Sequence, residues 1–249
     1  MSFHPYWTEG ADRPGRWLIT CDHATNTVPE AVNGGDLGLA REDMRRHIAF
    51  DPGALGVSRH LGELLDSPAL FANFSRLVID PNRGEDDPTL LMKLYDGTII
   101  PANRHADAAE CERRLDAYHR PYHAEYYRLA SRRPDTAICA VHSFTPQLQA
   151  RAPRPWHLGI LHAHDTRLAQ PLIARLQQEP DLCVEGNVPY SGHLPGDSIE
   201  RHALAMGLPN VLIEIRNDLI VDEAGQSRWA AMVAEALVAA NAKGNIDGR

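Results

Sequence analysis

The chain has 249 residues, 43% of them hydrophobic and 23% charged, which is the composition of an ordinary soluble globular protein. Its length is enough for one large α/β domain or at most two small ones, and we predict a single domain over residues 1–249. The formal net charge of −8 argues against a general surface for nucleic acid or anionic membrane, although local arginines can still hold a small anionic substrate.

Strand-like and helix-like segments alternate along the chain. Strands are predicted near 16–22, 69–80, 136–142, 157–163, 183–189 and 210–216. Helices are predicted near 41–50, 52–66, 105–132, 166–178, 197–206 and 226–242, and Pro121 should divide or kink the longest of them. Segments 30–40 and 84–104 are rich in turn-forming residues and are predicted to be loops. This alternation is typical of a mainly parallel sheet covered by helices on both faces.

Local signals agree with several of these helices. Asp51 precedes Pro52 and is predicted to cap the helix that follows, although its carboxylate is also a candidate metal ligand. Asp197 and Glu200 resemble a capping box, and Gly207 is predicted to end the helix that they begin.

Histidines occur where two apolar strands end. His23 follows WLITCD, and His142 ends TAICAVH and precedes Ser143. Because ligands bind at the carboxyl ends of strands in open α/β sheets, a metal shared by both imidazoles would explain both positions. Ser143 can orient such a ligand or contact the substrate. The alternative is that each histidine only forms hydrogen bonds at the end of its strand.

A third strand carries two charged residues. In NVLIEIRND, Glu214 and Arg216 share a face with Leu212, because alternate residues of a strand point the same way. A carboxylate in so apolar a strand is costly unless it is paired or functional. Glu214 is therefore either half of a structural ion pair with Arg216 or the general base of a hydrolytic reaction.

Another polar cluster lies in NFSRLVIDPNR. Arg76, Asn82 and Arg83 are candidate substrate-binding residues, since the planar guanidinium group of arginine matches a carboxylate. Asp80 ends the apolar run that separates them. The alternative for Arg83 is a solvated loop side chain.

Other histidines are reserve candidates for a metal or a substrate. His162 and His164 are two residues apart, so both would face the same side of a strand. His119 and His123 have helical i, i+4 spacing, but Pro121 lies between them. His47 precedes Asp51 by four residues and can share its helical face or point into the core.

The order of the motifs resembles that of the N-formylglutamate amidohydrolase (deformylase) family. The motifs are CDHATNTVP, HIAFDPGA, SRLVIDPNR, IPANR, HRPYH, VHSFTP and LIEIRNDL, and they cover roughly residues 16–220. The family is similar to zinc-dependent exopeptidases and deacylases, which implies a three-layer α/β/α fold with a mainly parallel or mixed sheet. It also implies hydrolysis of the amide of an N-acyl amino acid, with formate and glutamate as the namesake products, in histidine degradation.

The resemblance also implies roles for individual residues. His23 and His142 would bind zinc, or another divalent metal, and Glu214 would be the general base. Arg83, with Arg216, would hold the substrate carboxylate. Related exopeptidases commonly use a His-x-x-Glu pair, whereas here Asn26 stands three residues after His23, so Asp51 is the expected third ligand.

We therefore expect a metal-dependent hydrolase of small anionic N-acyl amino acids, most simply N-formyl-L-glutamate. The alternatives are a peptidoglycan-type amidase or peptidase, and a non-catalytic binding protein for an acidic metabolite. The four cysteines are far apart and form no C-x-x-C pair, which indicates reduced thiols. With no signal-peptide pattern and no apolar run of about 18 residues, the sequence predicts a cytoplasmic protein.

Overall fold

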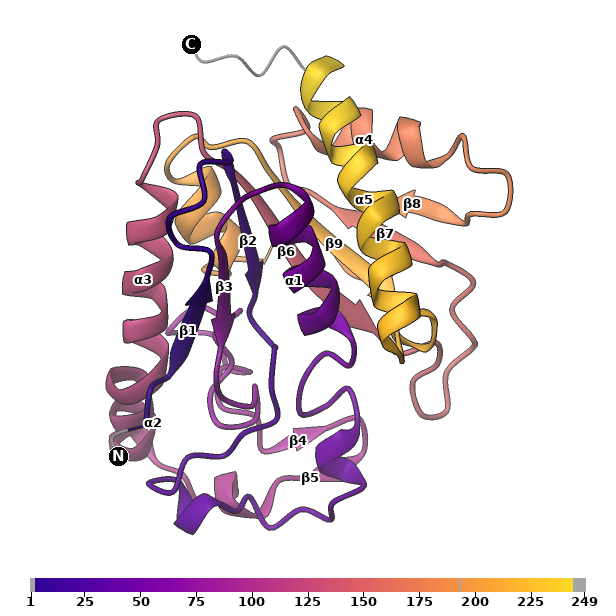
Figure 1. The fold of residues 1–249 in the computed structure, drawn as a ribbon. Helices are drawn as coiled ribbons and strands as arrows, with labels where there is room; N and C mark the ends of the chain where they lie inside the picture. Colours follow the sequence, from indigo (N-terminus) through magenta and orange to yellow (C-terminus); the bar gives the residue numbers. More distant parts are fainter. Residues whose placement is uncertain (1–2, 193, 244–249) are drawn as a thin grey trace.

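The computed structural model describes residues 3–192 and 194–243. Within these residues the main sheet has seven strands in the order β1-β3-β2-β6-β9-β7-β8 (Figure 1). They are β1 (Tyr6–Glu9), β2 (Trp17–Cys21), β3 (Ala69–Ala72), β6 (Ala137–Phe144), β7 (Leu158–Leu161), β8 (Val184–Gly186) and β9 (Asn210–Arg216). Strands β3, β2, β6 and β9 are parallel, whereas β1 is antiparallel to β3 and β7 to β9, and β8 is parallel to β7. The expected α/β fold with a mixed central sheet is confirmed.

Helices cover both faces of the sheet. One face packs against α1 (Ala54–Leu64), α4 (Ala169–Leu176) and α5 (Glu223–Lys243). The other packs against α3 (Arg120–Ala130) and the π-helical segments Leu115–His119 and Glu200–Leu204, with α2 (Ala108–Arg114) leading into the first of them. The short elements are the 3-10 turns Asn33–Gly35, Asp43–Arg45, Pro101–Asn103 and Asn217–Leu219 and the hairpin of β4 (Leu94–Tyr95) and β5 (Thr98–Ile99).

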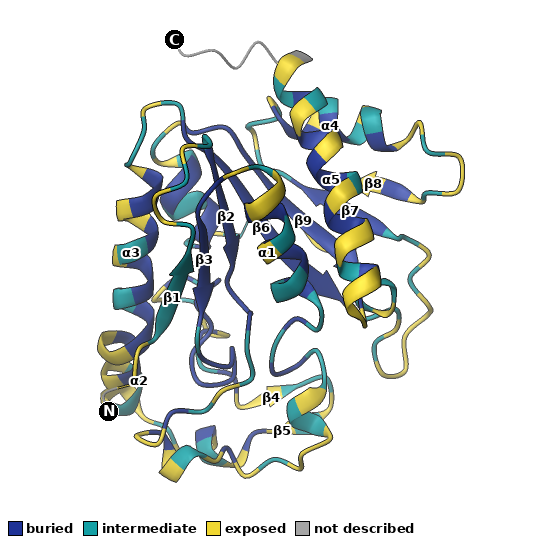
Figure 2. Ribbon diagram, in the orientation of Figure 1, coloured by how far each residue is buried: buried dark blue, intermediate teal, exposed yellow. Residues whose placement is uncertain are grey.

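The strands of the sheet centre are buried on both faces, which explains their nearly continuous apolar sequences (Figure 2). In β9, Val211, Ile213 and Ile215 belong to the core under α1, α4 and α5. Leu212 belongs to the core on the opposite face, where Glu214 also points. The predicted alternation of this strand is confirmed.

The strand predicted over 69–80 is too long, because β3 ends at Ala72. The residues after it are buried but form turns. Ser75 donates its N–H to the Thr27 carbonyl and its hydroxyl to the Ala49 carbonyl, and Val78 N–H bonds back to Ser75. The apolar run thus indicated burial correctly, although the backbone bonds to neighbouring loops instead of to a strand.

The helix predicted over 41–50 is reduced to the 3-10 turn Asp43–Arg45. Arg46 then adopts an extended backbone, and its guanidinium bonds to Asp96 and Thr98 of the β4–β5 hairpin. The prediction that Asp51 caps the next helix is also wrong. The cap of α1 is Gly53, at φ 82°, and the Asp51 side chain points to histidines instead.

The helical region predicted over 105–132 is divided, as expected from Pro121. A π-helical turn joins α2 to α3, and Pro121 lies in the first turn of α3, where its missing N–H costs nothing. The hairpin within 84–104 was missed, although its Asp96-Gly97 turn is a recognised hairpin signal. The four cysteines, all in the described part of the chain, are free thiols. In that same part, the helices lack the length and apolarity of a membrane span.

Candidate metal and hydrolytic site

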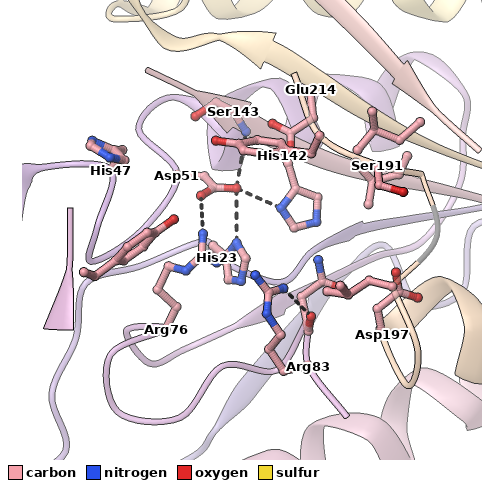
Figure 3. Close-up of a pocket in the computed structure, with 16 residues that line it drawn as sticks. His23, His47, Asp51, Arg76, Arg83, His142, Ser143, Ser191, Asp197 and Glu214 are labelled. Carbon is pink, nitrogen blue, oxygen red and sulfur yellow. Dashed lines mark hydrogen bonds and ion pairs between the residues drawn. The ribbon is translucent and has the colours of Figure 1, made fainter. Parts of the chain in front are cut away.

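A cavity of about 290 Å³ opens at the carboxyl ends of β2, β6 and β9, on the face covered by α3 (Figure 3). The carboxyl ends of parallel strands lie at the same edge of the sheet, so residues that are far apart in the sequence lie close together there. The polar lining comprises His23, His47, Asp51, Arg76, Asn82, Arg83, Tyr95, His142, Ser143, Tyr190, Ser191, Asp197 and Glu214. The apolar lining comprises Leu161, Leu194 and Leu212.

Three buried side chains in this cavity offer the donors of a metal site. Among the described residues, the candidate ligand group is His23, Asp51 and His142, with one ligand atom from each within 4.8 Å of the others. Asp51 Oδ2 lies 3.3 Å from His23 Nδ1 and 2.8 Å from His142 Nδ1 (Figure 3). Two imidazole nitrogens and one carboxylate oxygen form the donor set of many catalytic zinc sites, so these residues fit a zinc ion.

The remaining nitrogen of each imidazole faces a second buried carboxylate. His23 Nε2 lies 2.7 Å from Asp80 Oδ1, and His142 Nε2 lies 3.5 Å from Asp22 Oδ2. Carboxylates in this position fix the orientation of a ligand ring and raise its basicity. Both rings thereby present the same atom, Nδ1, to Asp51.

The charges of the cluster are strongly coupled. Burial opposes ionisation of Asp51, Asp22 and Asp80, but the adjacent histidines, and for Asp80 also Arg76, hold the pKa of each carboxyl below its ordinary value. Burial likewise opposes protonation of His142, yet the neighbouring carboxylate of Asp22 and the hydrogen bond to Asp51 raise the pKa of His142 well above its ordinary value. The cluster therefore favours positive charge at its centre.

Glu214 lies beside this cluster with an unsatisfied carboxyl group. Its residue is 6% exposed, and Oε2 is buried without a hydrogen-bond partner in the described structure. Burial, reinforced by the negative charge of Asp51, raises the pKa of Glu214 to about 7. A carboxyl group with such a pKa can accept and return a proton near neutral pH.

The two arginines that line the cavity differ in whether their charge is already paired with a carboxylate. Arg76 is already paired, with Nη2 2.8 Å from Asp80 Oδ2 and Nη1 3.5 Å from Asp51 Oδ1. Arg83 forms no ion pair within the described residues; its Nη1 donates to the Asn82 carbonyl and its Nε to the Thr89 hydroxyl. Arg83 is therefore the lining arginine whose charge is available to a ligand.

Two sequence-predicted site residues have other contacts. The Arg216 guanidinium lies outside the cavity lining, where it pairs with Asp218 and donates to the carbonyls of Arg154, Pro155 and Trp156. Ser143 lines the cavity, but its hydroxyl donates to the Pro52 carbonyl and its N–H to Asp51 Oδ2 at 3.3 Å. It contacts a candidate metal ligand directly.

The reserve histidines separate into three groups. His47 lines the cavity, with Nε2 3.5 Å from Asp96 Oδ2. His162 and His164 lie outside both the cavity lining and the ligand group. His119 and His123 are buried behind the cavity wall.

Several functional candidates were missed by the sequence reasoning. Asp22 had a local signal, since it directly precedes His23, but nothing local showed that it faces His142. Tyr190, Ser191, Leu194 and Asp197 come from the segment after β8 and reach the cavity only through the tertiary fold.

Comparison with known proteins agrees with this fold. A search of curated proteins gave no match. The chain is similar to the crystal structure of gene product Atu2144 from Agrobacterium tumefaciens, with 35% identity, a TM-score of 0.90 and coverage of 96% of this chain and 95% of that chain. It is also similar in fold to N-formylglutamate amidohydrolase from Ralstonia eutropha JMP134, with 22% identity, a TM-score of 0.67 and coverage of 94% and 96%.

A bacteriophage poly-gamma-glutamate hydrolase shares the fold at 12% identity and a TM-score of 0.50, over 96% of this chain and 89% of that chain. The family model for N-formylglutamate amidohydrolase matches residues 15–221, which include every candidate ligand and the unpartnered Glu214. The family is one of hydrolases that act on amide C–N bonds, and this chain belongs to the N-formylglutamate amidohydrolase family.

Proposed function

We propose that the chain is a zinc-dependent amidohydrolase that removes a formyl or other short acyl group from an amino acid, with N-formyl-L-glutamate as its first candidate substrate. The observation that carries this proposal is the convergence of two histidine Nδ1 atoms and Asp51 beside the unsatisfied carboxyl of Glu214. Membership of the amidohydrolase family supports the same reaction class. The free cysteine thiols support a cytoplasmic setting.

In this proposal His23, His142 and Asp51 hold the metal. A bound zinc ion would lower the pKa of a water molecule and polarise a carbonyl group. Asp80 and Asp22 hold the two rings, and the Ser143 N–H holds Asp51. These contacts hold the ligand atoms of His23, His142 and Asp51 in position without a bound metal.

Glu214 acts as the general base. Its carboxylate takes a proton from the attacking water, and the new carbon–oxygen bond forms at the acyl carbon of the substrate. Glu214 then returns the proton to the amide nitrogen as the carbon–nitrogen bond breaks. The overall reaction consumes one water and yields a carboxylic acid and a free amine, so no redox partner is needed.

The substrate is held by its carboxylate. Arg83 supplies the available charge, and the Asn82 side chain lies beside it in the cavity lining. Arg76 is held in place by Asp80 and Asp51, and its guanidinium favours the negative charge that develops on the acyl oxygen. We assign Arg216 no step of the reaction, because its donors bond to Asp218 and to backbone carbonyls.

Formate release tests the proposal. Purified protein is stripped of metal, reloaded with Zn²⁺ and assayed with N-formyl-L-glutamate and with N-formyl derivatives of neutral amino acids. We expect turnover only after reloading, and the highest kcat/KM for the acidic substrate. Zinc-independent turnover would overturn the metal site, and turnover of neutral substrates alone would overturn the glutamate assignment. No formate from any substrate would favour a binding protein for an acidic metabolite.

A further inference from the structure

Three histidines form a buried cluster directly behind the Asn82–Arg83 wall of the cavity. His119, His123 and His202 are 0%, 5% and 3% exposed. The ring centroids of His119 and His123 lie 4.3 Å apart, and those of His123 and His202 lie 5.0 Å apart. The π-helical turn before α3 ends at His119, and the second π-helical segment contributes His202.

Backbone carbonyls determine the protonation of this cluster. His119 Nε2 lies 3.1 Å from the Arg83 carbonyl, and His123 Nε2 lies 2.9 Å from the Pro81 carbonyl. A carbonyl oxygen can only accept, so both Nε2 atoms carry the hydrogen. With Nε2 protonated in the neutral ring, His123 Nδ1 accepts from His202 Nε2 at 2.8 Å. His202 and His123 thus form a directed chain of donors that ends on the Pro81 carbonyl, and His119 donates separately to the Arg83 carbonyl.

The two carbonyls flank Asn82, which is held from its other side as well. The Ser198 N–H donates to Asn82 Oδ1 at 3.2 Å, and the Asn82 N–H donates to Asp80 Oδ1 at 2.9 Å. Because the side-chain oxygen of Asn82 is engaged by Ser198, its NH₂ group is the end of the amide that remains available. No partner for this NH₂ group occurs among the described residues.

We propose that His119 and His123 are positioning residues for the substrate carboxylate. Their hydrogen bonds fix the backbone on both sides of Asn82, so that the Asn82 NH₂ group and the Arg83 guanidinium face the cavity as one set of donors. His202 keeps His123 in the required tautomer. This proposal rests on the proposed function, since it needs a carboxylate at Arg83, but it assigns the histidines no contact with the reacting atoms.

Paired substitutions test the role of each hydrogen bond. In the zinc-loaded enzyme, His119→Phe and His123→Phe keep an aromatic ring but remove the donor. The glutamine variants H119Q and H123Q keep a donor near the Nε2 position. We expect the phenylalanine variants to raise KM for N-formyl-L-glutamate about tenfold with kcat changed less than about threefold, and the glutamine variants to recover most of the loss. His105→Phe, at an exposed turn, is the control and should change neither constant.

A double-mutant cycle with Arg83→Met separates positioning from general destabilisation. If His119 acts through Arg83, adding H119F to R83M should have little further effect on KM, because the group that it positions is already absent. Fully additive effects, or glutamine variants as impaired as the phenylalanine ones, would overturn the positioning role. Circular dichroism of each variant establishes whether it folds. If a phenylalanine variant does not fold, the corresponding glutamine variant is measured in its place.

Calorimetric titration with L-glutamate distinguishes this proposal from the proposed function. If the wild-type enzyme binds L-glutamate but releases no formate, the function fails, and weaker binding by H119F than by H105F still supports positioning. Equal binding by wild type and H119F, with loss in R83M, overturns the histidine role but keeps Arg83. If the wild-type protein neither binds L-glutamate nor turns over the formyl substrate, both proposals fail.

Discussion

His142 and Glu214 are direct neighbours across adjacent parallel strands, since they pair in the register of β6 with β9. A candidate metal ligand and a candidate base therefore share one wall of the cavity, and backbone hydrogen bonds of the sheet set their separation. Sites built on strands hold their side chains more tightly than sites built on loops.

Glu214→Gln should abolish turnover while leaving the metal bound. The glutamine keeps the size of the side chain but cannot accept the proton of the attacking water, so we expect kcat to fall by about 10²–10⁴-fold. Formate release and zinc content of the same preparation measure the two effects. Arg216→Lys is the control and should stay within a few-fold of wild type. Retained activity in E214Q would remove Glu214 as the base.

His142→Ala should sharply reduce zinc content, because it removes one of three buried donors. Atomic absorption after dialysis against a weak chelator gives the stoichiometry. His162→Ala, outside the ligand group, should retain metal at the wild-type level. Stoichiometric zinc in H142A would show that the ligand assignment is wrong.

Asp80→Asn should weaken zinc binding without removing a ligand. The change deletes the charge that faces His23 Nε2 at 2.7 Å, and losses of such partners typically lower metal affinity about 10–100-fold. Competition with a chromophoric chelator measures the affinity. An exposed substitution, Asp116→Asn, provides the baseline, and an affinity for D80N equal to that baseline would contradict an orienting role.

The buried histidines should make the protein less stable in mild acid. Burial lowers the pKa of His202 from 6.5 to about 4, and it also lowers the pKa values of His119 and His123. Between pH 6.5 and about 4, His202 binds a proton in the unfolded chain but not in the folded protein. The free energy of unfolding therefore decreases as the pH falls from about 6.5 towards 4. For His202 the loss amounts to about 3 kcal/mol.

Urea unfolding at pH 7.5 and pH 4.5 measures this dependence. His202→Phe keeps a ring against Tyr126, with which His202 stacks at 4.2 Å, and should show a smaller decrease than wild type. An identical decrease in both proteins would show that His202 does not titrate as described.

Much of the fold was predictable because a strand that is buried on both faces has a nearly continuous apolar sequence. β2, β6 and β9 are buried on both faces, and their apolar runs placed them within a few residues. Since the ends of parallel strands meet, the same runs indicated that His23, His142 and Glu214 would converge on one edge of the sheet, and the structure brings them to one cavity.

The incorrect predictions concern residues whose contacts lie far away in the sequence, so that no local sequence pattern indicates them. Asp51 followed by Pro52 has the form of a helix cap, yet its carboxylate bonds to histidines 28 and 91 residues away in the chain. The apolar run after Ala72 is buried by loops, so its composition matched a strand that does not form. The pairing of His142 with Asp22, and of His123 with the Pro81 carbonyl, likewise depends on how distant elements pack.

Besides Leu212 and Glu214 of β9, the cavity lining comes from two stretches of chain with different tasks. The candidate ligands and Arg83 come from the first 144 residues, whereas Leu161, Tyr190 and Leu194 come from the later stretch around antiparallel β7. That stretch passes close to β7 because Gly159 has no side chain; a Cβ there would stand 1.7 Å from the Val188 carbonyl oxygen. Directed evolution can therefore diversify the later stretch to change the preferred acyl or amino-acid group, with the candidate metal ligands left untouched, as long as Gly159 is retained.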